Sequence, residues 1–267
     1  MKSSYIIDAH AHIGYWPNLN DCQQTLLDST KAHNISFTLV SFDGTEFQDE
    51  NNKRIRLISQ LIGFNKAYEF TCKNKKFGMI LWIRPNTESN ILEVENFINS
   101  HRNDIYGIGI HPFTSRIKVI DEKLFPYYKL AEKYALPILV HTAVDKYSSI
   151  KNLEIVAKEW PNLNFIAAHL ELYSKHKEAL RVLKQNNNIF GDTAWVDMDV
   201  IKELRDNDLM DKIMFGTDNP IDGIKTLDNP LYKKYFDNAI KLDQCDYDKL
   251  MYLNALRIYK IPEKLLK

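Results

Sequence analysis

The sequence predicts an α/β protein whose fold is a single-domain (β/α)8 TIM barrel. Short β-rich runs alternate with longer helical patterns along the 267 residues. About eight such pairs can be counted, which is the number that closes a parallel barrel. Side chains that can bind a metal stand at or near the ends of these runs, and a parallel barrel gathers its chemistry at the carboxyl ends of its strands. Both observations therefore point to the same fold.

The elements follow from local patterns. Crossover helices are expected over 121–135, with Asp121 as N-cap, and over 149–160, with Ser149 as N-cap, because apolar residues recur there at helical spacing and a proline follows each segment. The polar stretch Gln48–Arg54 leads into a further helical pattern, and its charges are typical of a solvated face. The predicted strands cover residues 5–10, 35–42, 77–83, 105–111, 137–141, 163–169, 188–193 and 212–217.

Composition narrows the class of protein. Thirty-five basic residues balance 35 acidic ones, so a small-molecule substrate is the expected partner, and binding to nucleic acid is not expected. No signal-like or membrane-spanning apolar run is seen, which predicts a cytoplasmic protein without membrane association. Three dispersed cysteines fit reduced thiols. No linker or repeat divides the chain, so residues 1–267 are expected to form one domain, and a homo-oligomer is compatible with this composition.

The most informative pattern is an ordered series of metal-ligand side chains at strand ends. Residues two apart in a strand point the same way, so His10 and His12 can grip one ion together. Imidazole nitrogens and a carboxylate oxygen suit a borderline divalent ion such as zinc, and an open coordination position makes such a site catalytic. The full series is His10, His12, His111, His141, His169 and Asp218.

With these motifs in place, the chain resembles the amidohydrolase superfamily, and within it the amidohydrolase-related branch of metal-dependent hydrolases and decarboxylases. The resemblance spans nearly the whole chain. It is carried by DAHAH (8–12), IHP (110–112), VHT (140–142), AH (168–169), GTDNP (216–220) and NALRIY (254–259).

The resemblance implies a set of roles. His10, His12, His141 and Asp218 would bind one metal ion, with His169 beside the bound water or substrate. Many relatives with two metals carry a bridging lysine where this chain has Gly109, so a mononuclear site is favoured and a two-metal site is the alternative.

Catalytic and substrate roles follow from chemistry. Asp218 can move the proton of the attacking water to the leaving group, and His169 can orient that water or stabilise an oxyanion. His111 can contact substrate, Arg84 can clamp a substrate carboxylate or complete a structural ion pair, and Trp16 and Trp195 can line the pocket or pack the barrel rim. Further candidates are Tyr15, Glu171 and Asp192, together with Asp8, which can support the ligand histidines or make a simple buried hydrogen bond.

Four functional hypotheses result. The leading one is a metal-dependent hydrolase that acts on a small amide, lactone or ester. The second is a mononuclear non-oxidative decarboxylase, which release of carbon dioxide would distinguish. The third is a TatD-type deoxyribonuclease, which the balanced charge disfavours. The fourth is a non-catalytic binding protein on the same barrel, since a fold alone does not establish function.

Overall fold

A computed structural model of the chain describes residues 4–15, 18–43, 45–47, 54–87, 90–221 and 226–267. For residues 45–47 and 54–57 the structure describes the backbone only. None of the helices in these segments is both long enough and apolar enough to cross a lipid bilayer.

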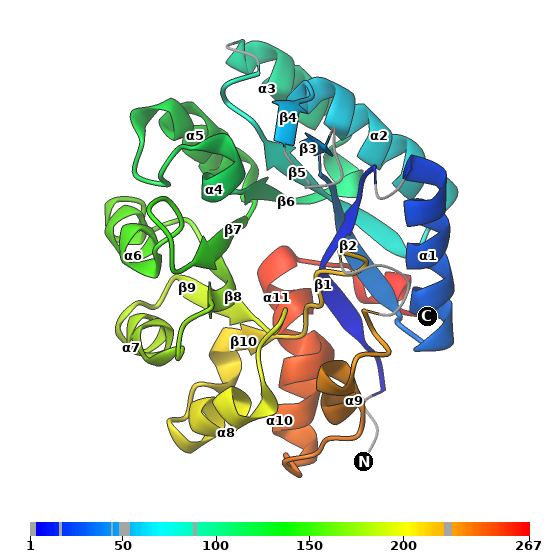
Figure 1. Ribbon diagram of the computed structural model, residues 1–267, viewed down its shortest axis with the longest axis vertical. Coiled ribbons are helices and arrows are strands. Elements are labelled where there is room, and N and C mark those ends of the chain that lie inside the picture. The colour runs from blue at the N-terminus through cyan, green and yellow to red at the C-terminus, as the bar shows by residue number, and fades with distance from the viewer. Residues whose placement is uncertain (1–3, 16–17, 44, 48–53, 88–89, 222–225) are drawn as a thin grey trace.

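The described residues contain one sheet of eight parallel strands that curls around a central axis (Figure 1). Neighbours in the sheet follow the order β1-β2-β5-β6-β7-β8-β9-β10, so each strand pairs with the next along the barrel. This confirms the predicted (β/α)8 barrel. The strands are β1 (Ile7–Ile13), β2 (Phe37–Phe42), β5 (Phe77–Ile83), β6 (Ile105–Ile110), β7 (Ile138–Ala143), β8 (Phe165–Leu172), β9 (Ile189–Asp192) and β10 (Ile213–Met214).

Helices connect the strands and surround them (Figure 1). They are α1 (Leu19–Ala32), α2 (Gln60–Lys73), α3 (Ile91–Ser100), α4 (Pro112–Ser115), α5 (Phe125–Tyr134), α6 (Ile150–Glu159), α7 (Lys177–Gln185), α8 (Met198–Asp206), α9 (Pro230–Phe236), α10 (Gln244–Asp248) and α11 (Asn254–Tyr259). A π-helical turn, Lys249–Leu253, joins α10 to α11.

The barrel closes between its first and last strands through backbone hydrogen bonds. Ala9 N donates to Phe215 O at 2.9 Å, and His12 N donates to Asn219 O at 2.8 Å. Asp218 N donates to His10 O at 2.7 Å. The seam thus continues past the short strand β10 and joins the His-x-His strand directly to the segment that carries Asp218.

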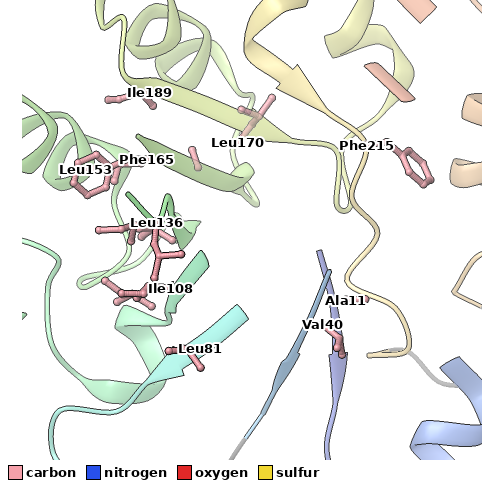
Figure 2. Close-up of a cluster of buried hydrophobic side chains, with 14 of the residues drawn as sticks. Ala11, Val40, Leu81, Ile108, Leu136, Leu153, Phe165, Leu170, Ile189 and Phe215 are labelled. Atoms are coloured by element: carbon pink, nitrogen blue, oxygen red, sulfur yellow. The ribbon is translucent and has the colours of Figure 1, made fainter. Parts of the chain in front are cut away.

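The core has two layers. A large cluster fills the space between strands and outer helices, and includes Val40 of β2 and Leu153 of α6 (Figure 2). A smaller cluster fills the barrel interior, where Ile80 and Met214 meet Ile258 of α11. Helix α11 belongs to the NALRIY segment and covers the end of the barrel opposite the strands' carboxyl ends. Packing at one end therefore leaves the other end free for a cavity.

The predicted elements correspond to observed ones with shifted bounds. Ser149 caps α6 by accepting from Lys151 N at 3.3 Å, as the sequence indicates. The segment 121–135 is divided into a 3-10 turn, Glu122–Leu124, and α5, because the proline in the first turn of α5 has no N–H to continue an earlier helix.

The segment before α2 differs from the prediction. An antiparallel hairpin, β3 (Thr45–Phe47) with β4 (Arg54–Leu57), precedes that helix. The helical pattern therefore begins later than the sequence suggested. Residues 48–53, which make up most of the predicted polar stretch, lie outside the described segments.

Candidate metal centre and active site

A cavity of about 220 Å³ lies at the carboxyl ends of the strands. It brings together six of the predicted site residues from five strand ends, which lie far apart in the sequence. Its lining is His10, His12, Ser41, Asp43, Trp82, Gly109, Ile110, His111, Leu139, His141, His169, Leu172, Asp218 and Ile221.

A bulge in β1 turns the two histidines toward this cavity. The pairing of β1 with β2 shifts register between Asp8 and Ala11. Before the shift, Ala9 packs in the barrel interior, whereas after it Ala11 packs against the outer helices. Such bulges re-aim side chains beside active sites. As a result His10 and His12 both face the cavity.

Three candidate ligand atoms converge. His10 Nε2 lies 3.1 Å from His12 Nε2, and His12 Nε2 lies 2.9 Å from Asp218 Oδ1. Asp218 Oδ1 is 3.4 Å from His10 Nε2. Among the described residues, donor atoms of His10, His169 and Asp218 also fall within 4.8 Å of one another. These donors are near enough to share one ion.

The Nδ1 atoms of three of the histidines have hydrogen-bond partners. His10 Nδ1 lies 2.9 Å from Asp192 Oδ2, and His169 Nδ1 lies 3.1 Å from Ala194 O. Each of these nitrogens carries a proton, because its partner is an acceptor. His12 Nδ1 lies 2.8 Å from Ser41 Oγ, which can accept as well. In the neutral rings the Nε2 lone pairs are thus left for a metal, so the residues present fit a divalent ion.

Electrostatics also favour a positive charge at this point. Burial opposes ionisation of His10, but Asp192 and Asp218 together raise the pKa of His10 to about 9. Burial likewise opposes ionisation of Asp218, yet the hydrogen bond with His12 and the fields of His10 and His169 hold its pKa well below the usual range. An anionic carboxylate among imidazoles is the charge arrangement expected of a cation site.

Three parallel rings form one wall of the cavity. The Trp82 and His111 rings lie 5.4 Å apart at 6°, and the His111 and His141 rings lie 3.8 Å apart at 12°. Burial and the nearby His169 lower the pKa of His111 to about 3. Since His111 Nδ1 accepts from Thr114 N at 3.4 Å, the neutral ring carries its proton on Nε2. His111 is thus a neutral hydrogen-bond donor at the cavity.

Two further predicted substrate contacts that the structure describes, Arg84 and Trp195, do not line the cavity. Arg84 is buried, its guanidinium donates to Phe42 O, and its backbone N donates to Gln60 Oε1 at 2.9 Å, so it ties β5 to β2 and α2. Trp195 donates its indole N–H to Asp218 Oδ2 at 2.9 Å. Trp16 lies outside the described residues.

The sequence favours two roles for Asp8 equally, support of the ligand histidines or a simple buried hydrogen bond, and in the structure the carboxylate that contacts the His10 ring belongs to Asp192. Asp8 Oδ1 accepts from His10 N at 3.2 Å and Thr217 N at 3.1 Å, and Oδ2 accepts from the Thr217 hydroxyl. It therefore holds the seam of the barrel and bonds neither imidazole. Asp192 is one of the further candidates from the sequence, and its place near the end of a predicted strand is the signal that points to it.

A (β/α)8 barrel with a histidine-carboxylate cluster in its catalytic end defines the class of metal-dependent barrel enzymes. A family model described as Amidohydrolase matches residues 99–261. The chain belongs to this amidohydrolase family, whose members include metal-dependent hydrolases and decarboxylases. A search of curated proteins gave no match.

Solved structures share the fold over nearly the full chain. A 5-carboxyvanillate decarboxylase from Novosphingobium aromaticivorans, complexed with manganese, is similar with TM-score 0.66 and 12% identity, covering 96% of each chain. A 4-oxalomesaconate hydratase from Rhodopseudomonas palustris has TM-score 0.67 and 16% identity, covering 98% of this chain and 97% of the other. A probable 2-pyrone-4,6-dicarboxylic acid hydrolase from Acinetobacter baumannii has TM-score 0.64 and 12% identity, covering 96% and 99%.

Proposed function

We propose that the protein is a metal-dependent hydrolase that uses one divalent ion, zinc, to activate water against a small amide, lactone or ester. The observation that carries the proposal is the meeting of His10 Nε2, His12 Nε2 and Asp218 Oδ1 within 3.4 Å of one another. The lone pairs of two imidazole nitrogens and a carboxylate oxygen repel one another at these distances. The arrangement therefore requires a shared proton or a cation between the atoms. A cavity adjoins this cluster, so a substrate can reach it.

The proposed ligands are His10, His12, His141 and Asp218. His141 lies beside the cluster, with its ring centroid 4.9 Å from that of His169. Gly109 lines the cavity without a side chain that could bridge two ions, which supports a mononuclear site. His169 stays the proposed neighbour of the reacting water, although its donor atom also comes within 4.8 Å of those of His10 and Asp218.

When bound, such an ion lowers the pKa of water from about 16 to about 7 and polarises a carbonyl. Asp218 then accepts the proton of the attacking water and returns it to the leaving group, while Trp195 holds its second oxygen at 2.9 Å. His169, fixed through Nδ1, orients the water with Nε2. The neutral His111 donates its Nε2–H to the substrate oxygen on which negative charge develops.

The size of the cavity supports a small molecule as the proposed substrate. Its volume of about 220 Å³ is below the range of drug-sized ligand sites. Apolar side chains adjoin the ligand cluster, and they favour a compact substrate with an apolar portion. These side chains are Ile110, Leu139, Leu172 and Ile221.

The second candidate is a non-oxidative decarboxylase, and the apolar lining is the observation that favours it. An apolar environment destabilises a substrate carboxylate more than the products that follow loss of carbon dioxide. The decarboxylase from Novosphingobium aromaticivorans shares the fold. Because that relative's structure contains manganese, manganese is the alternative to zinc as the bound ion.

We also propose that the protein is located in the cytoplasm.

The test combines metal analysis with a two-class substrate screen. The purified chain is stripped with a chelator, reloaded with zinc or manganese, and counted for metal. It is then offered small amides, lactones and esters with an acid-release readout, and aromatic and unsaturated acids with a carbon dioxide readout. Binding of about one ion per chain, together with formation of the carboxylic acid product, supports the hydrolase. Carbon dioxide release supports the alternative, and failure to bind either ion would overturn both.

A further inference from the structure

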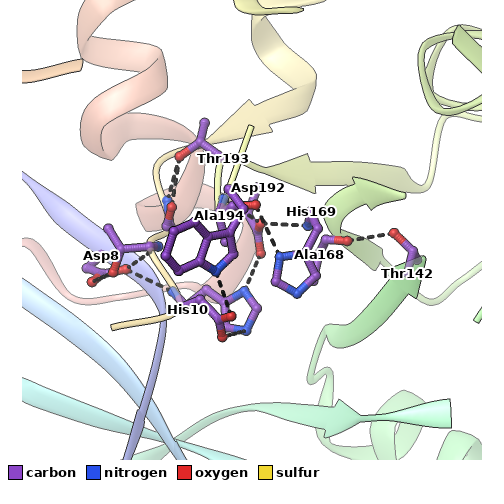
Figure 3. Close-up of polar contacts among 12 residues, drawn as sticks. Asp8, His10, Thr142, Ala168, His169, Asp192, Thr193 and Ala194 are labelled. Atoms are coloured by element: carbon purple, nitrogen blue, oxygen red, sulfur yellow. Dashed lines mark hydrogen bonds and ion pairs between the residues drawn. The ribbon is translucent and has the colours of Figure 1, made fainter. Parts of the chain in front are cut away.

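Asp192 lies at the end of β9 and is fully buried, yet both of its oxygens hold parts of the site (Figure 3). Oδ2 accepts from His10 Nδ1 at 2.9 Å. Oδ1 accepts from His169 N at 3.0 Å and from Ala194 N at 3.1 Å. One carboxylate therefore contacts a ligand ring from β1 and the backbone of the catalytic candidate on β8.

We infer that Asp192 is a positioning residue that fixes the tautomer of His10 and the orientation of His169 at the same time. The inference rests on the proposed function, because it assumes that His10 binds a metal through Nε2. With Nδ1 held as a donor, the His10 lone pair is left on Nε2, which faces His12 and Asp218 at 3.1 and 3.4 Å.

The contact at Oδ1 matters because the backbone of His169 is unusual. His169, Leu170 and Glu171 have φ values of 66°, 46° and 68°, a left-handed turn that non-glycine residues adopt at a cost. Thr142 supports this turn by donating its hydroxyl to Ala168 O at 2.6 Å and accepting from Glu171 N at 2.8 Å. Asp192 completes the support at the first residue of the turn.

A carboxylate is required at position 192 for a specific reason. Two backbone N–H groups hold Oδ1, so the side chain cannot flip without losing both bonds. In Asp192→Asn the amide Nδ2 would face His10 Nδ1 and donate to it. The ring proton would then sit on His10 Nε2, where it blocks metal binding. The substitution removes the tautomer control and leaves the two bonds to the turn in place.

Close packing at Gly216 provides a second variant. A Cβ built there lies 3.0 Å from the Cβ of His10 and 3.2 Å from the Cβ of Asp192. In Gly216→Ala, His10 and Asp192 would therefore have to move by a few tenths of an ångström, and no polar group would be removed. It keeps every ligand side chain.

The experiment measures zinc affinity of the full chain by competition with a chromophoric chelator, and thermal melting in excess chelator to verify folding. Asp192→Asn is expected to bind zinc about 10- to 100-fold more weakly than the wild type, with Gly216→Ala between the two. Asp8→Asn is the matched control, because Asp8 is an equally buried carboxylate that bonds no imidazole; its zinc affinity should fall clearly less than that of Asp192→Asn.

The outcomes separate this inference from the proposed function. A wild-type chain that takes up no zinc or manganese overturns the proposed function. Wild-type zinc affinity in Asp192→Asn, or an equal loss in Asp8→Asn, overturns the inference alone. If Asp192→Asn does not fold in chelator, Gly216→Ala decides, and unchanged affinity in that variant overturns the inference.

Discussion

Replacement of Trp195 by phenylalanine tests how firmly Asp218 must be held. The indole N–H donates to Asp218 Oδ2 at 2.9 Å, while the ring packs 6.0 Å from Tyr232. Phenylalanine keeps an aromatic ring against Tyr232 and removes the donor. A hydrogen bond to a charged group contributes about 1.5–3 kcal/mol. Because Asp218 is near the cavity and water can replace part of the bond, we expect a loss of about 1.4 kcal/mol, or tenfold in zinc affinity.

The assay is a zinc titration together with melting curves at fixed zinc. A tenfold weaker site reduces the zinc-dependent rise in Tm by about 3 °C for a chain of this size. The control is Trp160→Phe, since Trp160 packs against Tyr128 at 5.5 Å, among residues that do not line the cavity. Zinc affinity in Trp195→Phe equal to that in Trp160→Phe would refute the reasoning that the indole restrains Asp218.

Three further predictions follow from the site and from the outer helices. Replacement of both His10 and His12 by alanine removes two of the three converging metal-ligand atoms. This variant should lose stoichiometric metal binding but keep the circular dichroism spectrum of the barrel. A variant that still holds one ion would contradict the ligand assignment. Asp218→Asn should eliminate turnover even where some metal remains, measured in whichever assay the substrate screen identifies, and full turnover would rule out proton transfer by Asp218. The third prediction concerns stability in acid. Hydrogen bonds from Arg181 are the main reason that the pKa of Glu154 is lowered to about 2. The ion pair therefore stabilises the fold above the ordinary carboxyl pKa, and this stabilisation is lost as the pH falls toward 2. Arg181→Gln should therefore lower the free energy of unfolding at neutral pH, and the difference from the wild type should shrink between pH 4.5 and 2; a constant difference across that range would exclude this cause.

The substrate contacts show where sequence reasoning reached its limit. Arg84 follows the apolar strand β5, and a strand-end arginine was predicted either to bind a carboxylate or to serve the structure. Its side chain lies near Phe42 and Gly63, between the strands and α2, which is a structural position. Which way a side chain points just beyond a strand depends on the neighbouring helix, and this information is not local.

Local sequence patterns also do not predict the hydrogen-bond partners of the histidine rings. Ser41 ends β2, which pairs with β1, whereas Asp192 ends β9, which β10 separates from β1 in the closed barrel; both are ordinary strand-end side chains. Asp8 looked like the nearer support because it stands two residues before His10. The bulge after Asp8 explains the outcome, since it leaves that carboxylate at the seam with Thr217.

By itself, the sequence determined the alternation of strands and helices, the number of pairs, and the ordered set of ligand side chains at strand ends. These follow from periodicity and residue type, which are local properties of the chain. Only the tertiary structure decided that a bulge aims His10 and His12 at one point, that Asp192 and Ser41 hold their Nδ1 atoms, and that Trp195 holds Asp218. Hydrogen-bond partners and register shifts arise from contacts between distant segments, and these exist only when the barrel has closed.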